Sequence, residues 1–476
     1  MNLGVFRGRS AGEIAVIGLG KSGRSAAELL VRDGHRVYAS DAGDGDGARA
    51  AAAALAPLGV DAETGRHDLA RVARAALVVA SPGVPPEAPP LAAARAAGVP
   101  VVGEIEIGLH YLPGLRYVAV TGTNGKTTVT AAIGHLLRAL GHDAVDAGNI
   151  GTPLSELALR DRPPAWAALE LSSFQLHDTP SVSPTVGVVT NLSPDHLDRY
   201  GSLNEYYADK ARMFANAHAG SRWVRNGDDA EVLTLHRRIG LDALSGETFR
   251  FSLHDGSAHA HLDRVRDTLV LDGRVLLARA EFPLLGDHNV ANALAAALAV
   301  WAADTAHRTA EARRVMAGAL RTFHALAHRM EPVGTFGGVE WINDSKATNV
   351  SSTLVAVQGM TKPYVLLLGG RHKGESYEAL AEPLATRARA VLAYGEAAPI
   401  VERDLADRVP VHRLGSDFAE VVARARAIAH PGDAVLLSPA CSSYDMFRNY
   451  EERGAAFCRL AAGVTDRATG GDARAG

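Results

Sequence analysis

One pattern recurs along the chain: a short run of apolar, largely β-branched residues, then a polar or glycine-rich tip, then an amphipathic stretch. Apolar runs of this length, bounded by turn residues, predict strands that are buried on both faces. Their alternation with helical stretches is typical of parallel sheets made of β-α-β units. The runs start near residues 13, 35, 76, 117, 166, 186, 339, 364, 390 and 433. The pattern therefore predicts an α/β protein.

The length of the chain predicts several domains. At 476 residues and 47% hydrophobic content, the chain exceeds what one hydrophobic core can organise. We expect a Rossmann-like parallel sheet in residues 1–104, a central P-loop ATPase-type α/β domain in residues 105–325, and a C-terminal Rossmann-like α/β domain in residues 326–476. Apolar and polar positions alternate between residues 245 and 285, which predicts antiparallel strands there.

The stretch Tyr117–Thr128, YVAVTGTNGKTT, carries the clearest chemistry. A strand leads into a glycine-rich loop and then into a helix expected over residues 129–140, an arrangement that cradles nucleotide phosphates. The lysine of such a loop adds a mobile cation, and the hydroxyl that follows it can bind Mg²⁺. Val120 stands where the strict P-loop has a glycine, so this is a shortened variant. The loop residues expected to bind ATP are Gly122, Thr123, Asn124, Gly125, Lys126, Thr127 and Thr128.

Polar residues also follow other apolar runs of the central region. Glu170 ends the run WAALE, and His196 lies in the polar loop after VGVVT. Because the carboxyl ends of parallel strands meet at one edge of a sheet, both could reach Mg²⁺ and phosphates at the P-loop, although an acid there could also be a helix cap or a surface charge. Lys210, on the next amphipathic stretch, is by default a solvated side chain. Asn289 and Asn292 lie one turn apart on a long predicted helix, where they suit the edge of a base, although Asn289 could simply cap the helix.

The N-terminal region contains a G-x-G-x-x-G fingerprint at Gly18, Gly20 and Gly23, and Asp41 ends the next predicted strand. Taken alone, this spacing is typical of a dinucleotide-binding turn. The same glycines would equally serve a uridine diphosphate or a purely structural turn. The fingerprint therefore leaves NAD, a nucleoside diphosphate and a structural role open.

Charge and cysteine content narrow the class of partner. The net charge of −4 gives no basic surface for nucleic acid, so no nucleic-acid partner is expected. Two cysteines, Cys441 and Cys458, fit neither a zinc site nor a disulfide scaffold and indicate a reducing compartment. We find no signal-peptide pattern and no stretch near 18 uninterrupted apolar residues. A cytoplasmic protein without membrane insertion is therefore expected.

A longer series of motifs resembles a known family. In chain order it reads TGTNGKTT, GNIG, ELSSFQL, NLSPDHLDRY, HNVANA, HRME, NDSKATN, LLLGGRHKG and SPACSSYDMFRNYEERG. Over nearly the whole chain, this series resembles the cytoplasmic Mur ligases of peptidoglycan synthesis. Within that family, NDSKATN resembles the member that adds glutamate to UDP-N-acetylmuramoyl-L-alanine.

The resemblance implies an ATP-dependent ligase. A substrate carboxylate would attack the γ-phosphate of ATP to give an acyl phosphate, and the amine of glutamate would then displace phosphate, leaving an amide, ADP and Pi. The implied partners are UDP-N-acetylmuramoyl-L-alanine, glutamate and ATP; the resemblance favours D-glutamate, and the residues themselves do not decide between the D and L isomers. The implied cofactors are Mg²⁺ at two sites and a CO₂-derived carbamate on Lys210, and the protein is expected to be a monomer. The alternatives are another Mur-type or folylpolyglutamate-type amide ligase and, from the glycine fingerprint, a NAD-dependent oxidoreductase.

The resemblance also implies roles for single residues. The catalytic residues would be Lys126, His196, Lys210 and Lys346, and the metal ligands Thr127, Glu170, His196 and Lys210. Outside the P-loop, ATP would contact Asn289, Asn292, Arg329 and Asp344. The nucleotide substrate would be held by Gly20, Lys21, Ser22, Asp41, Ser81, Gly83, Asn149, Ser172 and His196. Glutamate would be held by Thr348, Lys373, Ser443 and Tyr450.

The chain departs from the family pattern at two of these places. The family leads us to expect an arginine two residues after Asp41, gripping the uracil or the diphosphate, but Ala42-Gly43 follows instead. That contact would be missing or would come from elsewhere, for example from Lys21. Tyr450 stands where a phenylalanine is more usual, and because the ring is kept we expect little effect.

Overall fold

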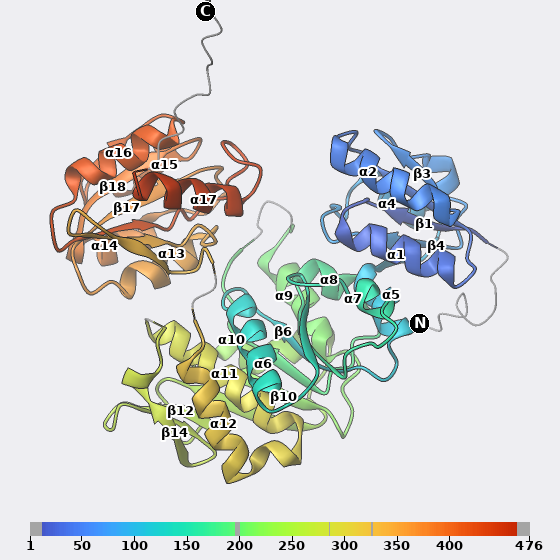
Figure 1. The fold of residues 1–476 in the computed structure, drawn as a ribbon, viewed down its shortest axis with the longest axis horizontal. Coiled ribbons are helices and arrows are strands. Elements are labelled where there is room, and N and C mark those ends of the chain that lie inside the picture. The colour runs from blue at the N-terminus through green and yellow to red at the C-terminus, as the bar shows by residue number, and fades with distance from the viewer. Residues whose placement is uncertain (1–11, 196–199, 285, 325–326, 464–476) are drawn as a thin grey trace, which may run out of the picture. The chain divides into compact units, whose positions relative to one another are not determined.

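The computed structural model describes residues 12–195, 200–284, 286–324 and 327–463. They form three β-sheets, mostly of parallel strands that alternate with helices (Figure 1). The predicted α/β class is therefore confirmed. The chain is arranged in two compact units: one holds the first and second sheets, and the other holds the third sheet.

The first sheet has five parallel strands in the order β3-β2-β1-β4-β5. The strands are β1 (Ile14–Ile17), β2 (Val37–Asp41), β3 (Asp61–Thr64), β4 (Leu77–Ala80) and β5 (Val101–Gly103). They are connected by helices α1 (Lys21–Arg32), α2 (Asp46–Leu55), α3 (Leu69–Val72) and α4 (Pro89–Ala96). The strand order reverses direction at β1 and β4, and in open parallel sheets ligands bind at the carboxyl ends beside such a reversal.

The second sheet has nine strands in the order β14-β13-β12-β11-β10-β9-β6-β8-β7. The strands are β6 (Arg116–Thr121), β7 (Ala144–Gly148), β8 (Trp166–Glu170), β9 (Val186–Val189), β10 (Arg222–Asn226), β11 (Glu247–Ser252), β12 (Ala260–Asp263), β13 (Thr268–Leu271) and β14 (Arg274–Ala278). The antiparallel pairing predicted for residues 245–285 is right for β12, β13 and β14 but wrong for β11, which pairs in parallel with β10 and β12. Helical turns between β10 and β11 provide the crossover that parallel pairing needs, and an alternating pattern cannot reveal it.

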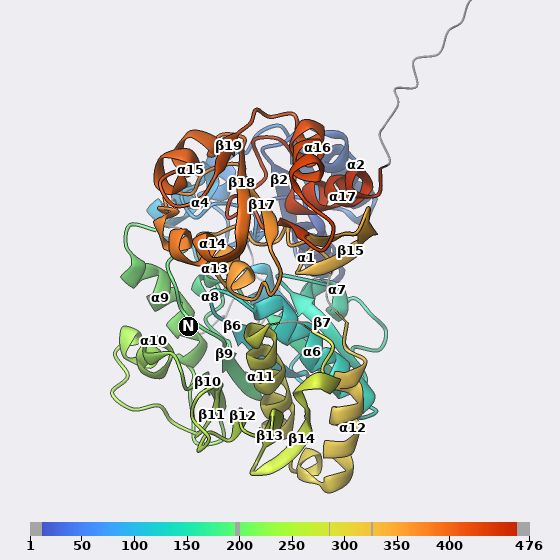
Figure 2. The same ribbon diagram turned by 90° about the vertical axis from the view of Figure 1, so that its left-hand side faces the viewer.

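The helices of this part of the chain are α6 (Lys126–Ala139), α7 (Leu154–Ala158), α8 (Ser173–His177), α9 (Leu203–Ala211), α10 (Ala230–Thr234), α11 (Asp287–Ala303) and α12 (Ala310–Arg321). α6 begins three residues earlier than predicted, because Gly125 adopts a left-handed conformation (φ 80°) that turns the loop directly into the helix. α6 packs against α12 (Figure 2). At this contact, His135 Nε2 lies 3.0 Å from the carbonyl oxygen of Ala319.

Helix α5 (Glu104–Tyr111) joins the first two sheets into one unit. It packs against α7, and Gly108 approaches it so closely that a Cβ on this glycine would lie 2.2 Å from Leu154 Cβ. α7 also packs against α1, where the hydroxyl oxygens of Ser25 and Ser155 are 2.8 Å apart. Within the described ranges, we find no helix with the length and apolar character needed to span a bilayer.

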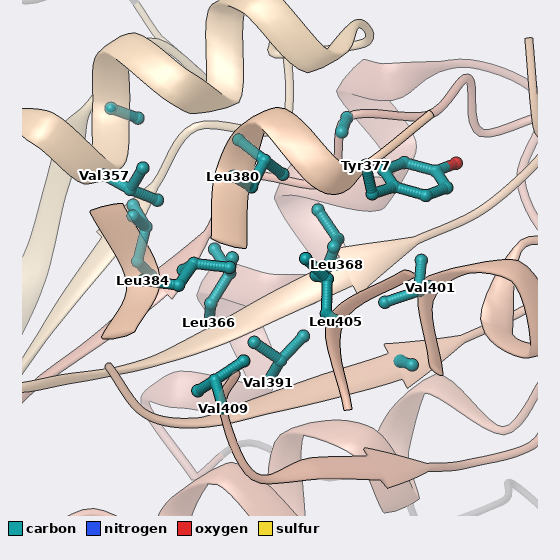
Figure 3. Packing of buried hydrophobic residues seen from close by; sticks show 14 of the residues in the cluster. Val357, Leu366, Leu368, Tyr377, Leu380, Leu384, Val391, Val401, Leu405 and Val409 are labelled. Atoms are coloured by element: carbon teal, nitrogen blue, oxygen red, sulfur yellow. The ribbon is translucent and has the colours of Figure 1, made fainter. Parts of the chain in front are cut away.

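The third sheet has six strands in the order β15-β16-β20-β17-β18-β19. The strands are β15 (Glu331–Phe336), β16 (Val339–Asn343), β17 (Tyr364–Gly369), β18 (Ala388–Tyr394), β19 (Val411–Arg413) and β20 (Ala434–Leu437). The helices are α13 (Val350–Gln358), α14 (Ala381–Arg387), α15 (Ala398–Leu405), α16 (Phe418–Ile428) and α17 (Tyr450–Ala461). Leu366 and Leu368 of β17 belong to a buried cluster with Leu380, Leu384 and Leu405 on one face of the sheet (Figure 3). Val365 and Leu367, which alternate with them, belong to a second cluster, so β17 is apolar throughout because both faces are covered.

Candidate active site

The P-loop lies at the carboxyl end of β6, where two glycines provide conformations that other residues adopt only with strain. Gly122 has φ 139°, and a Cβ there would lie 2.0 Å from Thr190 Oγ1. Gly125 has φ 80°, and a Cβ there would lie 2.4 Å from Asn292 Oδ1. The loop is thus packed too tightly to accept side chains at these two positions.

Lys126 opens helix α6 at the end of this loop. Its ammonium group folds back and donates to the carbonyl oxygens of Gly122 (3.1 Å) and Thr123 (2.6 Å). The side chain is only partly buried, so a phosphate can compete with these carbonyls for the cation. The first turn of a helix also presents backbone N–H groups that favour an anion.

Asn191, which the sequence analysis did not single out, fixes the shape of the P-loop from β9. Its side-chain oxygen accepts from Asn124 N (2.9 Å), its side-chain nitrogen donates to Asn124 O (3.0 Å), and its carbonyl oxygen accepts from Thr123 N (2.8 Å). The amides of Thr123 and Asn124 are therefore already engaged by protein. In the sequence, only the position of Asn191 after an apolar strand could have indicated this role. Many other loop residues occupy such positions, so Asn191 could not be distinguished from them.

Glu170 ends β8, directly beside β6 in the sheet, and is 1% exposed. Its Oε1 accepts from the amide of Asn149 (2.8 Å), whereas its Oε2 is buried without a hydrogen-bond partner among the described residues. A buried carboxylate oxygen left unpaired is costly unless a cation binds it. With the hydroxyl of Thr127 on α6, Glu170 therefore fits a Mg²⁺ site, although no group of three or more His, Cys, Asp or Glu placed to hold a metal ion occurs in the described part of the chain.

Lys210 is 1% exposed, so the default expectation of a solvated side chain is wrong. α9 packs against α8, and this packing turns Lys210 inward. Its ammonium group donates to the carbonyl oxygen of Gly122 (2.7 Å) and lies 4.5 Å from the centre of the Tyr206 ring. The lysine predicted as a metal-site residue thus contacts the P-loop itself.

The two asparagines of α11 also lie at the P-loop end of their helix. Asn289 and Asn292 are both 8% exposed, and Asn292 Nδ2 lies 3.4 Å from Asn289 Oδ1. Asn292 is the residue that crowds Gly125. The predicted shared face is confirmed, while a contact with adenine stays a prediction.

A cavity of about 620 Å³ lies at the carboxyl edge of the first sheet. Seven of the nine residues expected to hold the nucleotide substrate line it: Gly20, Lys21, Ser22, Asp41, Ser81, Gly83 and Asn149. His67 and the prolines Pro82, Pro85, Pro89 and Pro90, which were not predicted as site residues, also line it. Ser172 instead caps α8, where its hydroxyl accepts from Gln175 N (3.2 Å) and donates to the Gln175 side chain. His196 lies outside the described residues.

Several predicted residues of the third sheet stand at the ends of β16, β20 and β17, which are neighbouring parallel strands. Lys346 follows β16, and its ammonium group lies 3.6 Å from the centre of the Tyr450 ring. Asp344 accepts from Ser438 Oγ (2.8 Å) and Met330 N (3.2 Å), and burial raises its pKa to about 7, while nearby Arg329 acts in the opposite direction. The ring at position 450 thus supports the catalytic candidate Lys346 through a cation–π contact.

Lys373 follows β17 and lies beside an acidic side chain that the sequence analysis did not assign. Its ammonium group is 3.6 Å from Asp195 Oδ1, and Asp195 Oδ2 accepts from the side chain of Asn349 (2.8 Å). Burial and the nearby Asp195 raise the pKa of Glu375 to about 7. Thr348 lies on the loop after β16, and Ser443, 3% exposed, lies on the loop after β20, so both belong to this edge of the sheet.

The chain is similar over nearly its whole length to known proteins. The chain is 42% identical over 467 residues to the UDP-N-acetylmuramoylalanine–D-glutamate ligase of Anaeromyxobacter dehalogenans, covering 94% of this chain and 97% of that protein. It is 40% identical over 457 residues to the ligase of the same name from Gloeobacter violaceus, covering 95% and 99%. The chain belongs to the Mur ligase family. Relatives of this similarity share their whole length with it, so the resemblance seen in the motifs is confirmed.

Family models and solved structures agree with this membership. The Mur ligase MurD-like N-terminal domain matches residues 12–103, the Mur ligase middle domain residues 120–300, and the Mur ligase glutamate ligase domain residues 328–441. The fold is similar to that of a pseudomurein peptide ligase type C from Methanothermus fervidus (TM-score 0.60, 20% identity, 95% and 100% of the two chains). It is also similar to that of the UDP-N-acetylmuramate-alanine ligase MurC from Thermotoga maritima (TM-score 0.59, 20% identity, 95% and 100%).

Membership of the Mur ligases removes one of the open alternatives for the glycine fingerprint. Gly18, Gly20 and Gly23 lie within the MurD-like N-terminal domain rather than in a dehydrogenase. The NAD-dependent oxidoreductase is therefore set aside. In this Mur ligase the P-loop, Glu170 and Lys210 fall within the middle domain, and Lys346 and Lys373 fall within the glutamate ligase domain.

Proposed function

We propose that this Mur ligase uses ATP to join D-glutamate to UDP-N-acetylmuramoyl-L-alanine in peptidoglycan precursor synthesis, releasing ADP and Pi. The observation that carries the proposal is the end-to-end similarity, at 42% identity, to a protein named UDP-N-acetylmuramoylalanine–D-glutamate ligase. The proposal extends to a monomer that acts in the cytoplasm during cell wall synthesis. Among the Mur ligases, this substrate pair is favoured over other amide ligations by the name that the similar relatives share.

The first step joins the substrate carboxylate to the γ-phosphate of ATP. In this proposal the N-terminus of α6 and the ammonium group of Lys126 neutralise the phosphates, in exchange for the loop carbonyls that Lys126 now contacts. Thr127 and Glu170 would hold one Mg²⁺, and His196 with a carbamate on Lys210 would hold a second. Bound Mg²⁺ would supply charge neutralisation between two anions that must approach each other. The unpaired Glu170 Oε2 supports the first of these sites.

The second step needs glutamate with a free amine beside the acyl phosphate. Thr348, Lys373 and Ser443 are proposed to hold the carboxylates of glutamate, and Lys346 is proposed to steady the transferred phosphoryl group, with Tyr450 beneath its ammonium group. Arg329 and Asp344 are proposed to contact the ribose and phosphates of ATP, and Asn289 and Asn292 its adenine. Amine attack on the acyl carbon forms the amide bond and breaks the bond to phosphate.

An ATP-dependent phosphate release assay tests the function. With UDP-N-acetylmuramoyl-L-alanine as acceptor, D-glutamate should release phosphate and L-glutamate should not. Lys126→Ala should lower the rate at least about 100-fold, since it removes a cation that acts on developing charge. Arg138→Ala is the matched control, because Arg138 lies on the same helix but pairs with Asp146 (3.1 Å) and is 44% exposed. Phosphate release with neither isomer, or an unimpaired Lys126→Ala enzyme, would contradict the proposal.

A further inference from the structure

His67 lies in the nucleotide cavity, on the loop that follows β3. Its Nδ1 is 2.9 Å from the hydroxyl of Ser40, which is completely buried at the end of β2. This contact fixes the plane of the ring from one side and leaves Nε2 as the nitrogen through which the ring can bind a ligand. A half-buried, oriented imidazole in a cavity is built for recognition rather than for solvation.

The strand order determines the order in which the lining residues follow one another along the cavity. Along the sheet, the carboxyl ends follow in the order β3, β2, β1 and β4, and the lining residues follow the same order: His67, then Asp41 and Ala42, then the glycine turn at Gly18–Ser22, then Ser81–Pro85. The glycine turn opens α1, whose first-turn N–H groups are the natural site of a diphosphate. Asn149, on the loop after β7 of the second sheet, also lines the cavity. A nucleoside diphosphate with its phosphates at α1 and its sugar substituent toward Asn149 would place its base at the β2 and β3 end, toward His67.

The carboxylate of Asp41 cannot by itself provide the recognition of a base. Its two carboxylate oxygens accept from the backbone amides of Leu19 (2.7 Å) and Gly43 (2.8 Å), so the side chain braces the loops after β1 and β2. The arginine expected two residues after Asp41 is absent, and Ala42 lines the cavity without a polar group. The nearby cation Lys21 pairs with Glu156 of α7 (3.3 Å). The base end of the cavity therefore needs another polar side chain.

We infer that His67 recognises the uracil of the nucleotide substrate through a hydrogen bond from its ring to the edge of the base. This inference rests on the proposed function, because it takes a uridine diphosphate as the ligand. Burial lowers the pKa of His67, despite the opposing charges of Asp41 and Glu63, so the ring is neutral near pH 7. A neutral imidazole cannot replace an arginine on a phosphate, but it can pair with the carbonyl or N–H groups of uracil.

Binding of UDP and CDP, measured by calorimetry on the full chain, tests the inference. His67→Ala should weaken UDP binding about tenfold, the usual effect of losing one hydrogen bond in a protected site, and should weaken CDP binding less. His67→Phe keeps a ring of similar shape without its nitrogens and should behave like the alanine variant. In the phosphate release assay, both variants should raise KM for the nucleotide substrate and leave KM for ATP unchanged.

Arg66→Ala is the matched control. Arg66 is the preceding residue, with 81% of its side chain exposed, pairs with Glu63, and does not line the described cavity, so its removal should leave UDP binding unchanged. Wild-type UDP affinity in His67→Ala, equal losses for UDP and CDP, or a fully active His67→Phe enzyme would each overturn the base contact. A wild-type chain that does not bind UDP would instead overturn the proposed function, and the inference with it.

Discussion

At the scale of single residues, Lys210 shows how the fold changes what a side chain can do. It is buried at 1% exposure, and its ammonium group meets the carbonyl oxygen of Gly122 at 2.7 Å. Burial removes the water that would surround an exposed lysine, and protein groups of the P-loop and of α9 surround the Lys210 side chain instead. In the proposed carbamate, attack of the neutral amine on CO₂ would form an N–C bond, release one proton to solvent and leave a carboxylate group on the nitrogen. The proposed metal ligand would thereby be created from a cation.

Lys210→Ala is expected to lower the rate of phosphate release about 100-fold or more, because it removes an oxygen ligand and a contact of the P-loop. Formate or acetate should restore part of the rate by supplying the carboxylate in place of the carbamate. Lys362→Ala is the control, since Lys362 is 50% exposed and pairs with Glu340 at 2.6 Å. A ¹³C NMR signal of a carbamate in ¹³CO₂-treated wild type, absent from Lys210→Ala, would support the modification. Loss of activity without any rescue and without that signal would contradict it.

At the scale of elements, helix α6 is bounded by two glycines in left-handed conformations that face different surroundings. Gly125 (φ 80°) precedes the helix and has Asn292 Oδ1 2.4 Å from the position of a Cβ. Gly141 (φ 85°) follows the helix and has no atom within 4 Å of that position. A substitution at Gly141 therefore tests backbone strain alone, whereas a substitution at Gly125 tests backbone strain together with crowding at the P-loop.

We predict that Gly125→Ala and Gly141→Ala each lower stability by about 1–2 kcal/mol, the usual penalty of a left-handed conformation for an L-residue. Only Gly125→Ala should also impair the reaction, because the new methyl group must displace Asn292 or shift the loop; a shift near 1 Å can cost up to about 100-fold. Chemical denaturation and the KM for ATP separate the two effects. The combination Gly125→Ala with Asn292→Ala, which makes room for the methyl group, is compared with Asn292→Ala alone, because Asn292 is itself proposed to contact adenine. Equal KM values for ATP in Gly125→Ala and Gly141→Ala would refute the crowding.

The strand ends were the part of the site that the sequence could predict. Glu170, Asn149 and the P-loop follow apolar runs, and such runs place their ends at one edge of a parallel sheet whatever the details of packing. The burial of Lys210, the clamp formed by Asn191 and the position of His67 could not be predicted, because each depends on which strands become neighbours and which helix face turns inward. The parallel pairing of β11 was missed for the same reason, since a half-buried strand alternates in either direction.

At the scale of the whole molecule, the unit that holds the first two sheets is tied together by a buried carboxylate. Glu104 of α5 is 1% exposed, and its Oε1 accepts from both the amide and the hydroxyl of Ser155 on α7 (2.6 Å each). The same hydroxyl lies 2.8 Å from Ser25 on α1. Side chains of three helices, α1, α5 and α7, thus meet in one buried hydrogen-bonded chain through Ser155, and the ionisation of Glu104 in this chain is linked to the stability of the unit.

Burial raises the pKa of Glu104, only partly opposed by the hydrogen bonds from Ser155. Below the ordinary glutamate pKa of about 4.3, the group is protonated in both the folded and the unfolded chain, and its contribution to stability is fully present. As pH rises from there through the raised pKa, that contribution is lost, because the unfolded chain releases the proton first.

Glu104→Gln keeps an acceptor for Ser155 and removes the charge. The variant should therefore be more stable than wild type at pH 7.5, by a margin that shrinks as pH is lowered toward 5. Urea denaturation across this range measures the margin, with Glu87→Gln, a change at an exposed residue, as the control. A stability difference independent of pH, or a less stable Glu104→Gln protein at pH 7.5, would show that the buried charge of Glu104 does not destabilise the folded protein.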